Sequence, residues 1–325
     1  KSDLATEMIK DGKEFTKLQG VMGRYYALAA GEDEDVADAI AEHLYPRFAD
    51  DRLPEGELGQ VVALADRLDT LAGCVLAGFI PTGSQDPYAL RRQALAILRI
   101  LSQNELRCDL TGWIEKSLRN YSQPQEKVQE ATSVITGLFW GRLETLLQEL
   151  PAEIVQAVLS VFPLDPVENA RASEDLAKLQ GSETFQMLIE GARRCRNILV
   201  KADRLAEESL EPQERAQALQ RESRARWEKG ELKSYRAKEQ EDEAEQRLVE
   251  AAQQILPQLE KALAASDYTL AYESLATLGQ PIDRYFVEVL VNAPDPALRA
   301  RRLDWLESLH YLFARFADLS RLPAN

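Results

Sequence analysis

Histidine and cysteine are scarce in this chain of 325 residues, which contains two histidines and three cysteines. The cysteines, Cys74, Cys108 and Cys195, are odd in number and far apart in the sequence, so they do not indicate a disulfide framework. We expect free, buried thiols in a reducing compartment. Neither His43 nor His310 is followed by an aspartate, and no motif pairs a histidine with a nucleophile or a metal ligand. The sequence therefore predicts no catalytic residue and no metal site.

Long hydrophobic runs and strand-like patterns are missing as well. The most apolar stretch, residues 61–80, is interrupted by three charged residues, so it indicates no membrane span, and we see no signal peptide. Runs of alternating β-branched residues are almost absent, and glycine and proline are sparse. Because leucine, alanine, glutamate, arginine and glutamine dominate, we predict an all-α fold with essentially no sheet.

The chain carries a formal net charge of −15. This balance argues against a nucleic-acid partner, because such binding depends on lysine and arginine against phosphate. Net charge, however, describes solubility and long-range steering, and a local basic face can coexist with an acidic whole. The charge leaves both possibilities open.

Three Asp-Pro pairs predict helix starts, with the aspartate as N-cap and the proline at the first helical position. They are Asp86 with Pro87, residues 165–166, and residues 295–296. After the first pair, apolar residues at helical spacing from Leu90 to Leu101 predict an amphipathic helix. Residues 58–80 predict another helix, with Val62, Ala65, Leu68 and Leu76 on its apolar face.

The sequence around the first Asp-Pro pair is unusual. Residues 81–92, PTGSQDPYALRR, closely resemble a signature segment of the beta subunit of bacterial-type, two-subunit glycyl-tRNA synthetase. Residues 15–23 and 46–49 resemble further segments of that family. The segment 192–203 is similar to the one that opens its anticodon-binding domain, and residues 281–320 resemble a helical anticodon-binding domain of the DALR type.

The resemblance implies three parts. Residues 1–120 would form an HD-like helical domain, beginning with a helix marked by Leu4, Met8 and Ile9. Residues 65–69 are similar to the last helix of the HD phosphohydrolases, but the His-Asp pair of that metal site does not exist here, and we interpret Asp66 and Asp69 as fold determinants. Residues 121–187 would form a helical spacer and 188–325 the anticodon-binding domain.

A charged run at about 205–244 looks like an insertion into this last domain. Between Arg193 and Lys238 there are 13 basic and 8 acidic residues, a local charge of +5. A long solvated helix, or a helical hairpin that turns near residues 229–231, explains such a run. The alternative is a basic arm that touches RNA.

The resemblance also implies a function. The complete enzyme of that family joins glycine to its tRNA with ATP and magnesium, in a heterotetramer of two alpha and two beta subunits. The alpha subunit forms the adenylate, and the beta subunit positions the tRNA and reads its anticodon. By this resemblance, the present chain is a piece of such a subunit. We expect this piece to bind glycine tRNA, to need no cofactor and to catalyse nothing alone. We expect it to bind neither DNA nor a membrane. Its expected location is a bacterial cytoplasm or a plastid.

Arginine clusters near helix starts are the candidate contacts, because guanidinium groups bind phosphate with two donors and stack on bases. An aromatic side chain could stack on an unpaired base. Internal pairing with the many carboxylates is the competing explanation for each arginine. The candidate RNA-binding residues are Arg91, Arg92, Arg193, Arg194, Arg196, Asn197, Arg284, Tyr285, Arg299 and Arg302.

Two other functions fit the same sequence. A helical scaffold that binds only protein would suit the acidic balance, and it would differ from an RNA binder by a weak dependence on salt. A metal phosphohydrolase would require a bound divalent metal.

Overall fold

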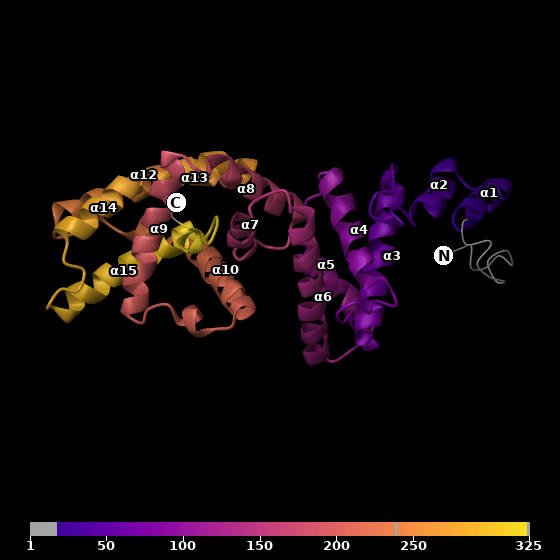
Figure 1. Cartoon of the computed structure of the whole chain (residues 1–325), viewed down its shortest axis with the longest axis horizontal. Coiled ribbons are helices and arrows are strands. Elements are labelled where there is room, and N and C mark those ends of the chain that lie inside the picture. Colours follow the sequence, from indigo (N-terminus) through magenta and orange to yellow (C-terminus); the bar gives the residue numbers. More distant parts are fainter. Residues whose placement is uncertain (1–17, 238–239, 324–325) are drawn as a thin grey trace. The chain divides into compact units, whose positions relative to one another are not determined.

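The computed structural model describes residues 18–237 and 240–323, and every regular element in these ranges is a helix (Figure 1). The prediction of an all-α fold is confirmed. The helix expected around Leu4, Met8 and Ile9 lies outside the described residues. Within the described ranges, no helix has the length and apolar character needed to cross a membrane.

The described chain forms two compact units, divided after residue 146, except that residues 164–167 return to the first unit. The predicted boundaries at 120 and 187 do not coincide with this division. Residues 121–146 belong to the first unit because α6 (Gln125–Leu146) buries Val128, Ile135 and Phe139 against its neighbours. The expected spacer is therefore divided between the two units.

The first unit consists of helices, and α6 packs against three others: α3, α4 and α5. Besides α6, its helices are α1 (Val21–Ala29), α2 (Glu34–Glu42), α3 (Glu57–Leu76), α4 (Leu90–Gln103) and α5 (Leu110–Arg119).

Helix α3 buries only part of the apolar face that the helical spacing indicates. Leu68 is buried as expected, together with Leu64 and Leu71, but Val62 is 37% exposed and Ala65 is also exposed. The helix carries apolar residues on two faces, and helical spacing alone does not indicate which one the neighbouring helices cover.

The buried face of α3 contains an arginine. The Arg67 guanidinium is 4% exposed and donates to three carbonyls of the turn after α2, those of His43 (2.6 Å), Leu44 (3.0 Å) and Pro46 (3.2 Å). Burial lowers the pKa of Arg67 to about 10, so the group still carries its charge at neutral pH. This side chain joins α3 to the end of α2.

Of the three predicted helix starts, two are confirmed and one is displaced. Helix α8 (Pro166–Leu179) and helix α15 (Pro296–Phe313) begin at the proline of their Asp-Pro pairs. Helix α4 begins at Leu90 instead, after Ala89 in a left-handed conformation (φ 56°). Asp86 still satisfies the helix start from a distance, because its carboxylate accepts from the amides of Leu90 (2.8 Å) and Arg91 (3.0 Å).

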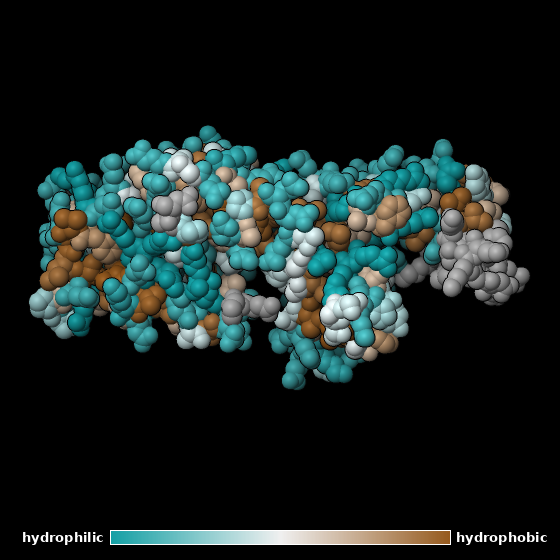
Figure 2. Space-filling model, in the orientation of Figure 1, coloured by the Kyte–Doolittle hydropathy of each residue, from teal (hydrophilic) through white to brown (hydrophobic). Residues whose placement is uncertain are grey.

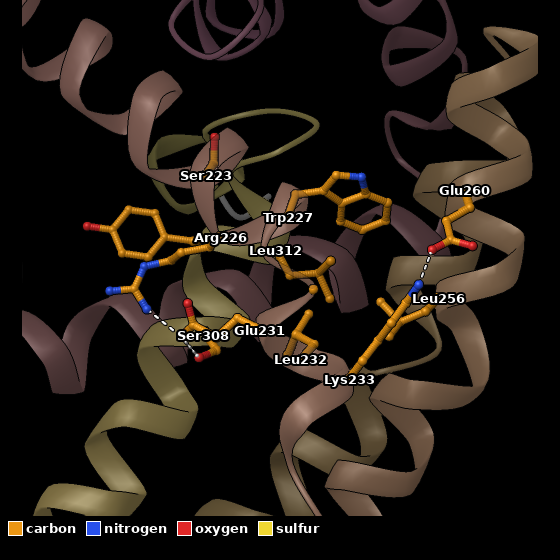
Figure 3. A pocket seen from close by; sticks show the side chains of 12 residues that line it. Ser223, Arg226, Trp227, Glu231, Leu232, Lys233, Leu256, Glu260, Ser308 and Leu312 are labelled. Atoms are coloured by element: carbon orange, nitrogen blue, oxygen red, sulfur yellow. Dashed lines mark hydrogen bonds and ion pairs between the residues drawn. The ribbon is translucent and has the colours of Figure 1, made fainter.

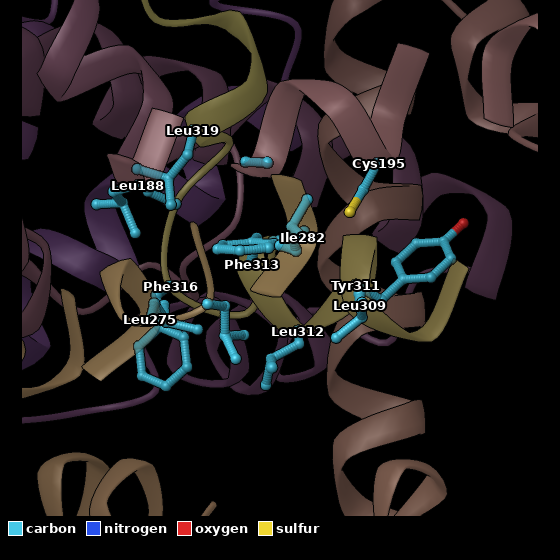
Figure 4. Packing of buried hydrophobic residues seen from close by; sticks show 14 of the residues in the cluster. Leu188, Cys195, Leu275, Ile282, Leu309, Tyr311, Leu312, Phe313, Phe316 and Leu319 are labelled. Atoms are coloured by element: carbon cyan, nitrogen blue, oxygen red, sulfur yellow. The ribbon is translucent and has the colours of Figure 1, made fainter. Parts of the chain in front are cut away.

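The second unit is built around α15 and α9, which pack on each other, and α9 also packs on the helical turn at Leu319–Arg321. Leu188 and Cys195 of α9, Ile282 of α14, and Leu309 and Phe313 of α15 belong to its core (Figure 4). Besides α8 and α15, its elements are α7 (Ala152–Leu159), α9 (Glu183–Lys201), η4 (Ala206–Ser209), α10 (Pro212–Glu228), α11 (Glu231–Ser234), α12 (Glu243–Ala265), α13 (Tyr268–Ala276), α14 (Gly279–Glu288) and η6 (Leu319–Arg321).

The charged run folds as a helical hairpin, one of the two forms expected from the sequence. Helices α10 and α11 meet at Gly230, whose φ of 65° suits a residue without a side chain. The hairpin is not a free arm, because Leu219 and Leu232 are buried in the core and Trp227 packs edge-to-face on Phe316.

The carbonyl contacts of Arg67 predict a stability effect. Substitution Arg67→Met leaves buried carbonyls without a donor, and each such acceptor costs about 1–3 kcal/mol. We expect a loss of roughly 3 kcal/mol in the free energy of unfolding of the first unit, measured by denaturant titration. Arg92→Met, an exposed change on α4, is the control, and an equal effect of both substitutions would contradict the role of Arg67.

Candidate nucleic-acid interface

Helix α9 presents one polar face to solvent. Ser182 caps the helix by accepting from the amide of Phe185 (3.1 Å), and the apolar stripe that begins at Phe185 is buried. The opposite face exposes Arg194, Asn197 and Lys201 at helical spacing. Because the buried stripe is fixed by the core of the second unit, these side chains are directed outward together.

Helix α14 lies beside α9, and a loop joins its end to the start of α15 in a corner (Figure 1). Helix α14 packs on α9, and the ion pair between Arg194 and Asp283 (2.9 Å) joins the two helices at the surface. Arg284 on α14 and Arg299 on α15 are exposed, and neither makes an ion pair or a side-chain hydrogen bond with the residues that the structure describes. We call the exposed side chains Asn197, Arg284, Val287, Leu290 and Arg299 the corner surface.

Two apolar members of the corner surface were not foreseen. Val287 is 83% exposed and Leu290 is 64% exposed, and Figure 2 shows hydrophobic surface where α14 and α15 meet. Helix geometry accounts for this exposure: Ile282 and Tyr285 define the buried side of α14, and Val287 follows Tyr285 by two residues, about 200° around the helix. Val287 therefore had to lie on the opposite side.

Tyr285 and Arg302, both predicted to contact RNA, lie in the interior. Tyr285 has no exposed surface, and burial raises the pKa of its phenol. Arg302 is 4% exposed and its guanidinium binds carboxylates and a carbonyl of its own chain. Neither side chain can stack on a base or bind phosphate in this fold, so these two predictions are wrong.

Two arginines of the first cluster in the second unit bind groups of their own chain. Arg196 makes a two-donor pair with Glu208 (3.0 and 2.6 Å), and Arg193 donates to the carbonyl of Leu322. The side chain of Arg194 is 42% exposed and pairs at the surface with Asp283. Internal pairing therefore accounts for Arg193 and Arg196, whereas Arg194 and Asn197 remain accessible.

Arg91 and Arg92 belong to the first unit, where both lie in the first turn of α4. Arg92 is exposed and Arg91 is half-buried, and neither side chain has an ion-pair partner among residues 18–237 and 240–323. They form an accessible basic position of the first unit.

Two arginines of the hairpin, and Arg204 before it, are paired with carboxylates of α15 and of the segment that follows it. Glu307 accepts from Arg204 (2.6 Å) and from Arg226, and Arg215 binds Asp318 (2.8 Å). The local charge of +5 is thus largely neutralised within the protein. This arrangement does not support the alternative of a basic arm.

A narrow crevice of about 30 Å³ lies in the seam between the hairpin, α12 and α15 (Figure 3). Trp227 and Leu312 line it, Arg226 pairs with Glu231 (2.6 Å) on one side, and Lys233 pairs with Glu260 (2.6 Å) on the other. Its volume suits one or two water molecules, and its charges already have partners.

Among the described residues, no three histidine, cysteine, aspartate or glutamate side chains are grouped so that they could hold a metal ion. His43 is buried with its Nδ1 atom 2.8 Å from the carbonyl of Ile40. Asp69, one of the two aspartates compared with the HD helix, accepts from the Tyr121 hydroxyl (2.9 Å). Both His43 and Asp69 are therefore engaged in contacts that hold the fold together.

Comparison with known proteins decides the family. The family model described as glycyl-tRNA synthetase beta subunit matches residues 1–160. The whole chain is 38% identical to the glycine–tRNA ligase beta subunit of Delftia acidovorans. Ninety-nine per cent of it aligns, at 39% identity, with that of Moorella thermoacetica. The chain belongs to the glycyl-tRNA synthetase beta-subunit family. It spans 42–43% of the length of these two relatives.

Within this family member, the pair of Arg196 and Glu208 predicts a dependence of stability on pH. Burial alone would raise the pKa of Glu208, but the hydrogen bond and charge of Arg196, with Arg321 and Arg215 nearby, lower it below the ordinary value of 4.5. The stabilisation is therefore fully present above pH 4.5 and is lost as the pH falls through the lower, folded-state pKa.

Substitution Glu208→Gln should destabilise the second unit by about 1–2 kcal/mol at pH 7, because Arg196 loses a charged acceptor. The difference from the unsubstituted protein should shrink as the pH falls below 4.5. Thermal unfolding between pH 3 and pH 7 measures this, with the exposed Glu190→Gln on α9 as control. A difference that does not change with pH would contradict the assigned pair.

Proposed function

We propose that this chain is the tRNA-binding part of a glycine–tRNA ligase beta subunit, and that the corner surface contacts the anticodon region of glycine tRNA. The observation that carries the proposal is the pair of exposed cations, Arg284 and Arg299, which have no partner in the described chain although the protein is strongly acidic. Membership in the family supports tRNA as the polyanion.

The chemistry of the corner surface suits single-stranded RNA. Arg284 and Arg299 supply charge for phosphate, which sets the position of the nucleic acid but does not read its sequence. The amide of Asn197 offers both a donor and an acceptor for a base edge. Val287 and Leu290 offer apolar contact to bases that have left the helical stack, in place of the buried Tyr285.

The chain contributes positioning, and not bond formation, in this proposal. The aminoacylation of glycine tRNA is assigned to the holoenzyme, in which the alpha subunit uses ATP and magnesium. The proposed assembly contains two alpha and two beta subunits. Every candidate contact of the present chain lies on a helix or helix-flanking loop, which holds the tRNA in a fixed register.

A protein-binding scaffold is the second candidate function, and one observation favours it. Leu58, Val61 and Val62 form an exposed apolar stripe on α3, with Val61 62% exposed. Such a stripe is typical of a protein interface. The two functions differ in their dependence on salt, because only phosphate binding releases counterions.

Charge reversal tests the corner surface. In Arg284→Glu and Arg299→Glu, we expect the affinity for glycine tRNA to fall roughly tenfold each, because a phosphate contact is replaced by repulsion. Binding is measured by titration of labelled tRNA transcript at two salt concentrations. The slope of log affinity against log salt should decrease by about one in each variant.

Lys261→Glu on α12 is the matched control, since it makes the same charge change at an exposed position of the second unit that likewise has no ion pair with the described residues. A transcript with altered second and third anticodon bases tests whether the surface reads sequence. Equal losses in the control and the corner variants would indicate a general charge effect. No binding of tRNA at low salt would refute the proposal and favour the scaffold.

A further inference from the structure

One buried side chain connects the corner surface to the core. The Nη1 atom of Arg302 donates to the carbonyl of Leu290 (2.9 Å), in the loop that joins α14 to α15. The Nη2 atom of the same guanidinium binds Asp242, the residue before α12, and lies 3.5 Å from Glu245 in its first turn. Arg302 therefore ties the loop to a third helix.

This connection requires the forked shape of arginine. A guanidinium presents donors in two directions within one plane, whereas a lysine ammonium is a single point charge on a flexible stem. The carbonyl of Leu290 lies on one side of the fork and the carboxylates of α12 on the other. A positive charge alone would satisfy the carboxylates but would not hold the loop.

The surroundings of Arg302 are closed to solvent. Glu245 is 1% exposed, Tyr285 has no exposed surface, and Arg302 itself is 4% exposed. Moving a charge into such a place is unfavourable unless it is paired, so the contacts of Arg302 are held strongly. The side chain of Leu290, by contrast, is 64% exposed while its carbonyl is bound from inside.

The loop held in this way determines how the corner surface is displayed. Arg284 and Val287 lie on α14 just before it, Leu290 lies in it, and Arg299 follows in the first turn of α15. A change in the loop would alter the spacing between Arg284 and Arg299. It would also move Leu290 relative to both arginines.

We propose that Arg302 is a positioning residue for tRNA: its fork fixes the α14–α15 loop, and thereby the geometry with which the corner surface reads the anticodon. The proposal rests on the proposed function of that surface. It assigns to the buried arginine an indirect role, in place of the direct contact expected from the sequence.

The test is aminoacylation of glycine tRNA by the holoenzyme assembled from alpha subunit and full-length beta subunit, with the substitution Arg302→Lys. Lysine retains the charge beside Asp242 and Glu245, so the fold is kept, but the donor to Leu290 is lost. We expect the KM for tRNA to rise roughly tenfold, with kcat changed by less than about twofold. Discrimination against a changed anticodon should fall by a similar factor.

Arg215→Lys is the matched control. Arg215 is a half-buried arginine paired with a buried carboxylate, Asp318, but it has no contact with the α14–α15 loop among the described residues. Thermal unfolding of both variants shows whether they lose similar stability. If the two variants lose similar stability, Arg302→Lys should still raise the KM for tRNA, whereas Arg215→Lys should leave it unchanged.

The outcomes distinguish the positioning role of Arg302 from the tRNA-binding function of the corner surface. If Arg284→Glu and Arg299→Glu raise the KM and Arg302→Lys behaves as Arg215→Lys does, the positioning role is refuted and the corner surface stands. If neither charge reversal affects the KM, the function of the corner surface is refuted first. If Arg302→Lys keeps full anticodon discrimination, a positive charge is sufficient and the fork has no role.

Discussion

Helix α15 is buried along almost its whole second half, and this burial is the constraint on which the second unit depends. Side chains from Arg302 to Phe313 lie inside, with the exception of Asp304, and they include Glu307, Ser308 and His310. A polar group in such a place needs a partner from the protein because water cannot supply one. The hairpin and the segment before it supply partners: Arg226 of α10 and Arg204, which follows α9, bind Glu307, and Glu231 of α11 accepts from the Ser308 hydroxyl.

The same requirement accounts for the distribution of charge. Most arginines of the hairpin lie beside carboxylates, so the basic run does not become a basic surface. The acidic excess of the chain is compatible with RNA binding if a few cations remain exposed without partners, as Arg284 and Arg299 do within the described chain. In the first unit, Arg67 fulfils the need of buried carbonyls in a comparable way.

Local sequence patterns predicted where helices begin better than they predicted which side chains those helices bury. Residues 165–166 and 295–296 begin helices as expected, because an aspartate cap and a proline at the first turn act within a few residues. The start of α4 moved to Leu90 because Asp86 can reach the same amides through a turn. On α3 the helical spacing did not indicate which apolar side chains are buried, since apolar residues lie on two faces of the helix.

The sequence by itself determined the helical class, most helix positions and the family, because composition, capping residues and motif sequences are local properties of the chain. Only the tertiary structure decided which arginines can be reached by a ligand. Arg204 and Glu307 are 103 residues apart and yet in contact, and no spacing rule indicates such a pair. Arg299 and Arg302 lie within one turn of the same helix, but one faces solvent and the other the core, because α12 and the α14–α15 loop cover only one side of that turn.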